Sequence, residues 1–309
     1  MGSRYLNYNL ALKDEFSERI QKISINAGFT CPNRDGSKGI GGCTYCNNQT
    51  FSPEYCKPAN TIAKQLEAGI DFFRHKYRHQ HYFAYFQSYT NTYASTEILK
   101  KRYEEALAHP QVCGLVIGTR PDCVSDELLD YFSDLSKRYY IMIEYGVEST
   151  KDETLELINR GHDYACSVEA IQKTAERGIR TGAHLILGLP KEDRETILTH
   201  ADEISRLPLT ALKLHQLQLI RGTKMAQQYV ENPDWFHLYD VDEYIDLAID
   251  FIERLNPKIA IERFVSQSPA DLLLAPDWKL KNFEFTEKLK KRLIARDAWQ
   301  GKLFDITHG

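Results

Sequence analysis

The sequence predicts an α/β protein built as a partial barrel of six strand–helix units, followed by an α/β extension at its C-terminal end. Two observations support this fold: apolar, β-rich runs alternate with helical patterns, and the turns between them are short. Such alternation is typical of parallel strands joined by right-handed crossovers. Six units suggest an incomplete relative of the eight-unit barrel. A doubly wound sheet would show the same alternation, so both arrangements remain open at this step.

The expected strands are six apolar runs separated by helical patterns. The pattern around 125–135 illustrates the helices, because Leu128, Leu129, Phe132 and Leu135 share one face and acidic residues occupy the first turn. Two further helical pieces lie between the fourth and fifth strands. The other expected helices cover 63–77, 99–107 and 192–207. We expect the strands at 21–26, 82–87, 114–119, 139–147, 181–189 and 211–220.

The C-terminal part departs from this alternation. A helix is expected at 239–255, a strand at 258–264 and a basic helix at 283–296. We therefore divide the chain into a partial barrel over residues 1–220, which contains a cysteine loop at 31–46, and an extension over 221–309 that packs on the edge of the barrel.

Composition narrows the class of protein. The 309 residues carry 39 basic and 43 acidic side chains, a net charge of −4, and 42% of them are hydrophobic, which is enough for a large core. No run of 18 apolar residues is present, and the first residues lack the apolar segment of a signal peptide. Together with unpaired thiols, these features predict a cytoplasmic protein that does not contact a membrane.

Three cysteines stand close together in the sequence TCPNRDGSKGIGGCTYCN: Cys31, Cys43 and Cys46. A cubane iron–sulfur cluster has four irons and is normally held by four thiolates, so three local thiolates would leave one iron open to chelate a small molecule. Glycines in the loop would let the backbone wrap closely around such a bulky group. They are Gly36, Gly39, Gly41 and Gly42.

A zinc site is the main alternative for these cysteines, with Cys56 as a possible fourth ligand. A disulfide framework is disfavoured, because the chain has seven cysteines and most lie outside this stretch. Cys56 and the remaining three cysteines show no close spacing, so we interpret them as small buried residues. The remaining three are Cys113, Cys123 and Cys166.

Eight motifs in order along the chain resemble the radical S-adenosylmethionine (SAM) superfamily, in particular its YhcC/YtqA-like branch, which is related to the radical SAM domain of the elongator catalytic subunit. The resemblance implies a [4Fe–4S] cluster on Cys31, Cys43 and Cys46, with SAM on the open iron. It further implies reductive cleavage of SAM to a 5′-deoxyadenosyl radical, and a flavodoxin- or ferredoxin-type electron donor. The motifs are AGFTCPNRDGSKGIGGCTYCN, YFQSYTNTY, GTRPDCV, IEYGVES, INRGHD, HLILGLP, LKLHQLQLIRGT and LLLAPDW.

The same resemblance implies positions that bind SAM. Tyr45 would pack near the adenine, and Arg160 would meet the SAM carboxylate, although a surface position at a helix end is an alternative for this arginine. Relatives have a Gly-rich segment after the second strand, where this chain has Gln87, Ser88 and Thr90. Glu144 and Ser149 end the fourth strand, where relatives contact the ribose or the amino group. A glutamate in an apolar strand is costly to bury without a partner, which favours a role inside the barrel for Glu144.

Candidate catalytic and substrate-binding residues follow the other strands. His184 lies between apolar neighbours and is either catalytic or a hydrogen-bonded core residue. Arg120 and Asp122 follow the third strand and either pair with each other or face the substrate. Lys213 and His215 alternate along the sixth strand and therefore share one face, which we expect to be the barrel interior.

Resemblance to the elongator domain implies transfer RNA (tRNA) as the substrate, at the C5 side chain of the wobble uridine. Two basic segments could then hold phosphates, although each could also be an ordinary solvated helix face. A small metabolite or a protein is the alternative substrate, and a zinc-binding interaction module without redox chemistry is the remote alternative. The basic residues concerned are Arg74, Lys76 and Arg78 in the first segment and Lys288, Lys290, Lys291 and Arg292 in the C-terminal helix.

Overall fold

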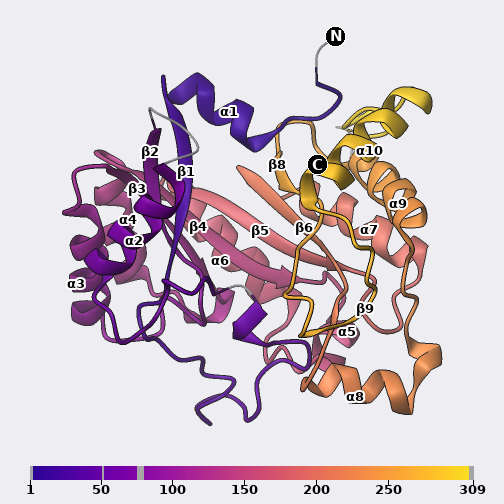
Figure 1. Ribbon diagram of the computed structural model, residues 1–309, viewed down its shortest axis with the longest axis horizontal. Coiled ribbons are helices and arrows are strands. Elements are labelled where there is room, and N and C mark those ends of the chain that lie inside the picture. Colours follow the sequence, from indigo (N-terminus) through magenta and orange to yellow (C-terminus); the bar gives the residue numbers. More distant parts are fainter. Residues whose placement is uncertain (1–2, 51, 75–79, 306–309) are drawn as a thin grey trace.

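A curled sheet of seven parallel strands forms the centre of the computed structural model, which describes residues 3–50, 52–74 and 80–305 (Figure 1). The strands lie in the order β1-β2-β3-β4-β5-β6-β8, so the sheet is wound in one direction without a reversal. A doubly wound sheet would contain such a reversal. The strands are β1 (Arg19–Ile25), β2 (Gln80–Phe86), β3 (Val112–Thr119), β4 (Tyr140–Glu148), β5 (Arg180–Leu187), β6 (Ala211–Gln216) and β8 (Ala260–Arg263).

Helices connect successive strands and cover the outer face of the sheet (Figure 1). Several begin at a side chain that accepts a hydrogen bond from the first turn, such as Ser125, Asp163 and Asp193. The helices are α1 (Tyr8–Glu15), α2 (Ile62–Arg74), α3 (Thr96–Leu107), α4 (Asp126–Ser136), α5 (Asp152–Leu157), α6 (Tyr164–Glu176), α7 (Arg194–Ser205), α8 (Lys224–Glu231), α9 (Val241–Arg254) and α10 (Asn282–Ala295).

The six-strand partial barrel expected from the sequence is confirmed. The C-terminal extension contributes a seventh strand, β8, which pairs with β6 in the same sheet. The run expected as one strand at 211–220 divides into β6 and the short β7 (Leu219–Ile220), which pairs antiparallel with β9 (Leu273–Ala275). Helices α1 and α8 and strand β9 were not anticipated. The helix expected at 63–77 is described as far as Arg74, and its last three residues lie outside the described part of the chain.

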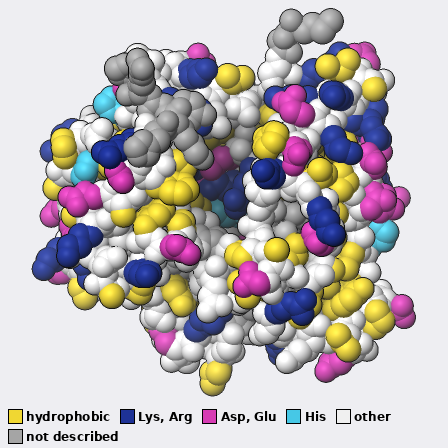
Figure 2. All heavy atoms as spheres, in the orientation of Figure 1, with side chains coloured by type: hydrophobic (Ala, Val, Ile, Leu, Met, Phe, Trp, Pro, Cys, Tyr) yellow, Lys and Arg dark blue, Asp and Glu magenta, His cyan; other side chains and the backbone are white. Residues whose placement is uncertain are grey.

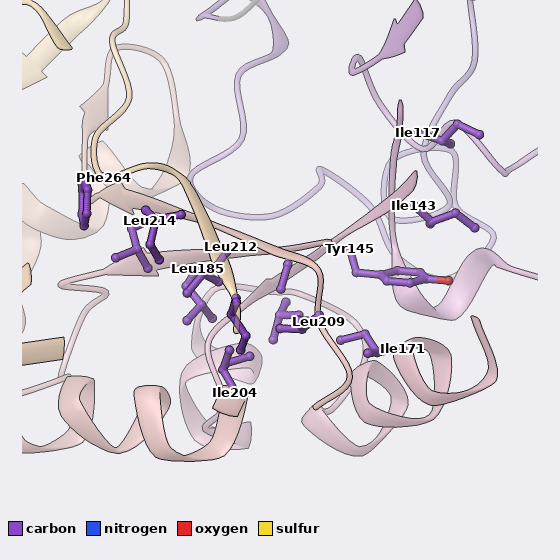
Figure 3. Close-up of a cluster of buried hydrophobic side chains, with 14 of the residues drawn as sticks. Ile117, Ile143, Tyr145, Ile171, Leu185, Ile204, Leu209, Leu212, Leu214 and Phe264 are labelled. Carbon is purple, nitrogen blue, oxygen red and sulfur yellow. The ribbon is translucent and has the colours of Figure 1, made fainter. Parts of the chain in front are cut away.

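The main core lies between the outer face of the sheet and the helices (Figure 3). Ile143 of β4, Leu185 of β5 and Leu212 of β6 are fully buried there, with Ile171 of α6 and Ile204 of α7. Because side chains alternate along a strand, the neighbours of these residues on β4, β5 and β6 point to the inside of the barrel. Those neighbours are the polar residues Glu144, His184 and Lys213.

Helix α1 closes the end of the barrel at which the strands begin. Tyr8 belongs to a second apolar cluster with Phe83, Tyr140 and Met142, and its hydroxyl lies 2.9 Å from that of Tyr140. The segment before α1 is attached to β8 through a hydrogen bond from the Ile261 amide to the Leu6 carbonyl oxygen (2.7 Å). The barrel interior is therefore open at the other end, where the strands finish and the loops with functional motifs begin.

Candidate active site

One cavity of about 260 Å³ lies at the carboxyl ends of the strands. The cysteine loop after β1, the inward side chains of the strands, and the loops that follow β2, β3, β6 and β8 line it, together with Arg160 from the turn between α5 and α6. Figure 2 shows the hollow in the middle of this face, with basic, acidic and histidine side chains in its depth. Eleven of the residues predicted from the sequence line this cavity. They are Cys31, Cys43, Tyr45, Cys46, Gln87, Thr90, Arg120, Glu144, Arg160, His184 and His215.

The cysteine loop is a series of tight turns. The amides of Arg34 and Asp35 both donate to the carbonyl oxygen of Cys31, and the Gly42 amide donates to that of Asn33 (2.7 Å). Gly42 adopts a φ of +79°, and a Cβ at this position would lie 2.9 Å from Nε of Arg34. Glycine is therefore required at this position, where the loop turns back on itself before Cys43.

A segment far along the chain holds the loop in place. The amide of Thr44 donates to the carbonyl oxygen of Ile158 (2.9 Å), and Nδ2 of Asn159 donates to that of Gly42 (2.8 Å). In return, Nδ2 of Asn33 donates to the carbonyl oxygen of Asn159 (2.6 Å). The turn between α5 and α6 thus fixes the backbone of the cysteine loop through three hydrogen bonds.

Nitrogen donors surround two of the three sulfurs. Nη1 of Arg160 lies 3.5 Å and Nδ2 of Asn33 lies 3.6 Å from Sγ of Cys43. Nδ2 of Asn48 lies 3.9 Å from Sγ of Cys46. Donors and positive charge next to a sulfur stabilise the thiolate, which is the form that binds metal.

The three cysteines of the loop line one cavity. Within the described part of the chain, no three His, Cys, Asp or Glu side chains converge on a point where one metal ion could be held. A cubane cluster does not need such convergence, because each thiolate binds a different iron. Cys56, the possible fourth zinc ligand, is buried and does not line the cavity. The zinc interpretation therefore gains no support from the structure.

The predicted SAM-binding residues divide into two sets. Five of the seven line the cavity: Tyr45, Gln87, Thr90, Glu144 and Arg160. Tyr45 also packs against the apolar cluster around Ile158 and Ile186. The other two are buried beside the cavity without lining it. Ser88 contacts the hydroxyl of Ser52 (3.1 Å), and Ser149 donates to Oε1 of Glu192 (2.6 Å).

Arg160 links the cysteine loop to the end of β4. Its guanidinium donates from Nη2 to the carbonyl oxygen of Gly146 and from Nη1 to Cys43, and it lies 3.8 Å from a carboxylate oxygen of Glu148. The side chain is almost fully buried, so a position on the surface at a helix end is not what the structure has.

Arg120 and Asp122 pair with each other. Nε and Nη2 of Arg120 donate to the two carboxylate oxygens of Asp122 (2.9 and 3.0 Å), and Lys38 lies 2.7 Å from the same carboxylate. Burial alone would raise the pKa of Asp122, but the hydrogen bonds from Arg120 and Lys38 hold this pKa well below its usual range. Arg120 lines the cavity, with its Nη1 buried and unpartnered, whereas Asp122 does not line it.

Glu144 is the centre of an ionic network inside the barrel. Its carboxylate accepts from Nζ of Lys213 (2.6 Å), Nζ of Lys22 (2.8 Å) and Nε2 of His184 (3.0 Å). Burial would raise the pKa of Glu144, but the two lysines and His184 hold it well below the usual value. Glu144 is therefore ionised at neutral pH, and its three hydrogen-bond donors offset the cost of burying a carboxylate in an apolar strand.

The two lysines share a second carboxylate, that of Glu262, at 2.5 Å from Lys22 and 3.2 Å from Lys213. Lys213 also donates to the hydroxyl of Tyr85 (3.0 Å). We call the four charged side chains Lys22, Glu144, Lys213 and Glu262 the ion box. Two positive and two negative charges make it neutral overall when both lysines are protonated.

The two lysines of the ion box differ in acidity. Burial lowers the pKa of Lys213 to about 8, and the positive charges of Lys22 and Arg263 act in the same direction. Burial also disfavours the charged form of Lys22, but Glu144 and Glu262 outweigh it and raise the pKa above the usual value. Lys213 is thus the side chain of this group that loses its proton at the lower pH.

Two neutral histidines, His184 and His215, lie between the ion box and the cavity. The rings of His184 and His215 are 5.4 Å apart, centroid to centroid. Burial lowers the pKa of both, with additional repulsion from Lys213 for His184 and from Arg263 for His215. Because His184 donates from Nε2 to Glu144, its Nδ1 carries the lone pair. Lys213 itself does not line the cavity.

Three further residues complete this interior and are not predicted from the sequence: Lys22, Glu262 and Arg263. Lys22 lies in β1, where isoleucines alternate with polar residues, and Glu262 and Arg263 are the last two residues of the short strand β8, so none of them stands out as Glu144 does in the apolar strand β4. Their partners could not be identified, because β1 and β8 are far apart in the sequence and meet only where the sheet curls. Arg34 and Asn33 of the cysteine loop are not predicted either, because a loop sequence has no regular alternation from which the direction of a side chain can be inferred.

The basic segments lie away from the cavity. Lys290, Lys291 and Arg292 belong to α10, and none of them lines the cavity. Arg292 forms ion pairs with Asp246 (2.6 Å) and Asp242 (3.0 Å) of α9, and Lys290 pairs with Glu287 (2.8 Å). Arg74 at the end of α2 pairs with Asp71 (2.8 Å). Lys76 and Arg78 lie outside the described residues.

Helices long and apolar enough to traverse a bilayer are absent from the described part of the chain.

Comparison with known proteins identifies relatives along nearly the whole length. Residues 26–204 match the family described as the radical SAM superfamily, and residues 209–295 match the radical SAM C-terminal domain. The chain is 34% identical to YtqA of Bacillus subtilis, over 97% of this chain and 93% of that protein. It is 26% identical to a tRNA uridine(34) acetyltransferase of Methanocaldococcus infernus, over 59% of this chain but only 34% of that protein.

The fold has a counterpart among solved structures. The Elp3 protein of Methanocaldococcus infernus with an N-terminal deletion superposes with a TM-score of 0.69 and 18% identity, over 91% of this chain and 64% of that one. At this identity the likeness concerns the fold, which is the curled parallel sheet with a C-terminal extension.

Proposed function

The chain belongs to the radical SAM superfamily and is an enzyme of that class, and we propose that Cys31, Cys43 and Cys46 are the residues that hold its [4Fe–4S] cluster. Membership of the family implies both the cluster and SAM. The observation that carries the assignment is that these three thiols, all from one loop, line the same cavity and have N–H donors beside two of the sulfurs.

When bound, the cluster would supply the electron for reductive cleavage of SAM, the chemistry by which a hydrogen atom would be abstracted from the substrate. Around it, Arg160 and Asn33 donate to the Cys43 sulfur, and Arg34 donates from Nη2 to the carbonyl oxygen of Cys46 (2.9 Å). Tyr45 offers a half-buried aromatic ring for the adenine. The ion box lies inside the barrel and α1 covers the end at which the strands begin, an arrangement that would limit the access of water to a radical.

Enzymes of this family need a reductant. We propose a flavodoxin- or ferredoxin-type donor, because clusters of this kind work at potentials around −400 mV.

The direct test of this function is anaerobic incubation of the protein with dithionite and SAM, followed by chromatography of the products. We expect slow formation of 5′-deoxyadenosine and methionine without added substrate. Formation of S-adenosylhomocysteine alone would identify a conventional methyltransferase and refute the proposal.

We further propose tRNA as the substrate, at the C5 side chain of the wobble uridine. Support comes from relatives that are named for uridine 34 of tRNA, and from exposed lysines on α10. The matched part of those relatives is about a third of their length, so acetyl transfer is not carried over to this chain.

A nucleoside profile of tRNA from a strain that lacks this protein tests the substrate. A changed modification at the wobble uridine supports the proposal. An unchanged profile, together with SAM cleavage by the purified protein, would favour a small metabolite or a protein as the substrate.

A further inference from the structure

Arg263, at the end of β8, is a positive charge in the cavity wall without a carboxylate partner among the described residues. The two acids of the ion box, Glu144 and Glu262, are both shared between Lys22 and Lys213. The ion box is balanced by itself, so it leaves no negative charge for Arg263.

Two other arginines in the same wall are compensated. Arg120 makes a two-pronged ion pair with Asp122, and Arg160 lies within 4 Å of Glu148. Arg263 instead contacts the ring of His215, with Nη2 at 3.1 Å from Nε2 and 3.4 Å from Nδ1, and its Nε is buried without an acceptor. His215 is neutral, because burial and Arg263 itself hold its pKa well below the usual value, so it supplies no countercharge.

An uncompensated guanidinium in a largely buried position is unfavourable unless a ligand completes it. The planar guanidinium matches the geometry of a carboxylate or a phosphate, to which it donates two parallel hydrogen bonds. A neutral imidazole keeps one N–H group, so His215 can add a donor beside the guanidinium.

We infer that Arg263 and His215 bind an oxyanion of the substrate, a carboxylate or a phosphate group, at the β8 side of the cavity. This inference rests on the proposed function, since it assumes that the substrate of the radical reaction enters this cavity. The oxyanion is distinct from the carboxylate of SAM. On the cysteine side the arginines are Arg34 and Arg160, which contact Cys46 and Cys43, whereas the contacts of Arg263 are with β6.

The loop after β8 is held ready for such a ligand. Gln216 and Ser266 exchange two hydrogen bonds, from the Ser266 amide to Oε1 (2.8 Å) and from Nε2 to the Ser266 carbonyl oxygen (3.0 Å). Ser268 donates to Oε1 of Gln218 (2.8 Å). All four residues line the cavity, so the wall around Arg263 is ordered before a ligand arrives.

Equilibrium dialysis of the cluster-loaded protein with labelled inorganic phosphate and labelled acetate tests the inference. Saturating SAM is included so that the open iron cannot take the anion. We expect binding of at least one probe, weakened about tenfold or more in Arg263→Gln, because a charge-assisted pair is lost. Binding of phosphate alone identifies a phosphate site, and binding of acetate alone a carboxylate site. Arg254→Gln, which removes an arginine paired with Asp202 on the outer surface, is the matched control and should bind as the parent does.

A second measurement needs no variant and therefore does not depend on its folding. Phenylglyoxal labels accessible arginines, and peptide mass spectrometry reads the label. The bound probe should protect Arg263 and leave Arg254 labelled. The inference is overturned if the parent binds neither probe, if Arg263→Gln binds equally well, or if the probe does not protect Arg263.

The outcome is separable from that of the proposed function, because SAM cleavage is measured on the same parent protein. Anion binding that depends on Arg263 without 5′-deoxyadenosine formation would refute the radical function and leave the anion site standing. SAM cleavage without anion binding would refute the anion site and leave the radical function standing.

Discussion

Lys22 of β1 and Glu262 of β8 form an ion pair 2.5 Å apart, across the seam at which the curled sheet does not close. In the described strands, the backbone of β1 pairs with β2 and that of β8 pairs with β6, so the edges of the sheet meet through side chains. Glu144 and Lys213 extend the pair to β4 and β6. Ion pairs thus connect the two edge strands of this partial barrel, β1 and β8, which have no backbone pairing with each other.

Breaking this seam should destabilise the fold. We expect Lys22→Met to lower the free energy of unfolding by about 3 kcal/mol, because removing one member of a largely buried ion pair leaves the other charge uncompensated. Denaturant unfolding monitored by circular dichroism measures the change. Lys137→Met, at an exposed pair with Asp134, is the control and should leave the stability as it is. A Lys22→Met protein as stable as the parent would mean that the ion box does not hold the seam.

The three cysteines of the loop should each be required for the cluster. Anaerobically prepared protein should contain about four irons and four sulfides per chain, and Cys31→Ala, Cys43→Ala or Cys46→Ala should abolish this content, because two thiolates hold a cubane poorly. Iron and sulfide analysis provides the measurement. Cys56→Ala should retain the full content. Loss of the cluster in that variant, or one zinc per chain without sulfide, would contradict the ligand assignment.

Lys213 should make stability rise with pH in a defined window. Its pKa of about 8 in the folded state lies below the value of 10.5 expected for the unfolded chain, so the unfolded state binds more protons between these two pH values. The cost of burying a charged lysine is present below pH 8 and is relieved as the pH rises toward 10.5. The free energy of unfolding of the parent should therefore increase across this window relative to that of Lys213→Met. A constant difference between the two proteins would show that Lys213 titrates normally.

The exposed lysines of α10 should contribute to tRNA affinity if tRNA is the substrate. We expect the triple reversal Lys288→Glu, Lys290→Glu, Lys291→Glu to weaken binding and to flatten the slope of log affinity against log salt by roughly 2 units or more. Arg292 is left in place, because its ion pairs with Asp242 and Asp246 join α10 to α9. Reversal of Lys137 and Lys258, which are exposed elsewhere, is the control. Equal affinity of the triple variant and the parent would remove α10 from the interface.

Much of the fold could be predicted from the sequence because hydrophobic period and turn positions are local. The order of six strands and the inward direction of Glu144, Lys213 and His215 follow from alternation alone. Ser149 shows where alternation fails. The pairing of β4 with β5 shifts register between Gly146 and Glu148, and Glu148 adopts a φ of +69°. The face on which the next residues lie therefore cannot be counted from the strand, and Ser149 turns to Glu192 instead of the cavity.

The partners in the ion box could not be predicted for a different reason. A charge in an apolar strand indicates that a partner exists, but it carries no information about which strand supplies it. Lys22 and Glu262 lie 240 residues apart and meet only because the whole sheet curls. Whether the strand at 260–263 joined the barrel or a separate unit was equally a question of long-range pairing.

The support of the cysteine loop by the turn at Ile158–Arg160 has a consequence for biogenesis. All three thiols are synthesised before residue 47, whereas Asn159 and Arg160 follow Gly42 and Cys43 by 117 positions. A nascent chain on the ribosome thus exposes its cysteines long before the peptide that shapes them exists. The chain acquires a preformed cradle only after β4 and α5 have folded. Iron–sulfur delivery should therefore be a late event in maturation, and thiols that emerge early must be kept reduced until then.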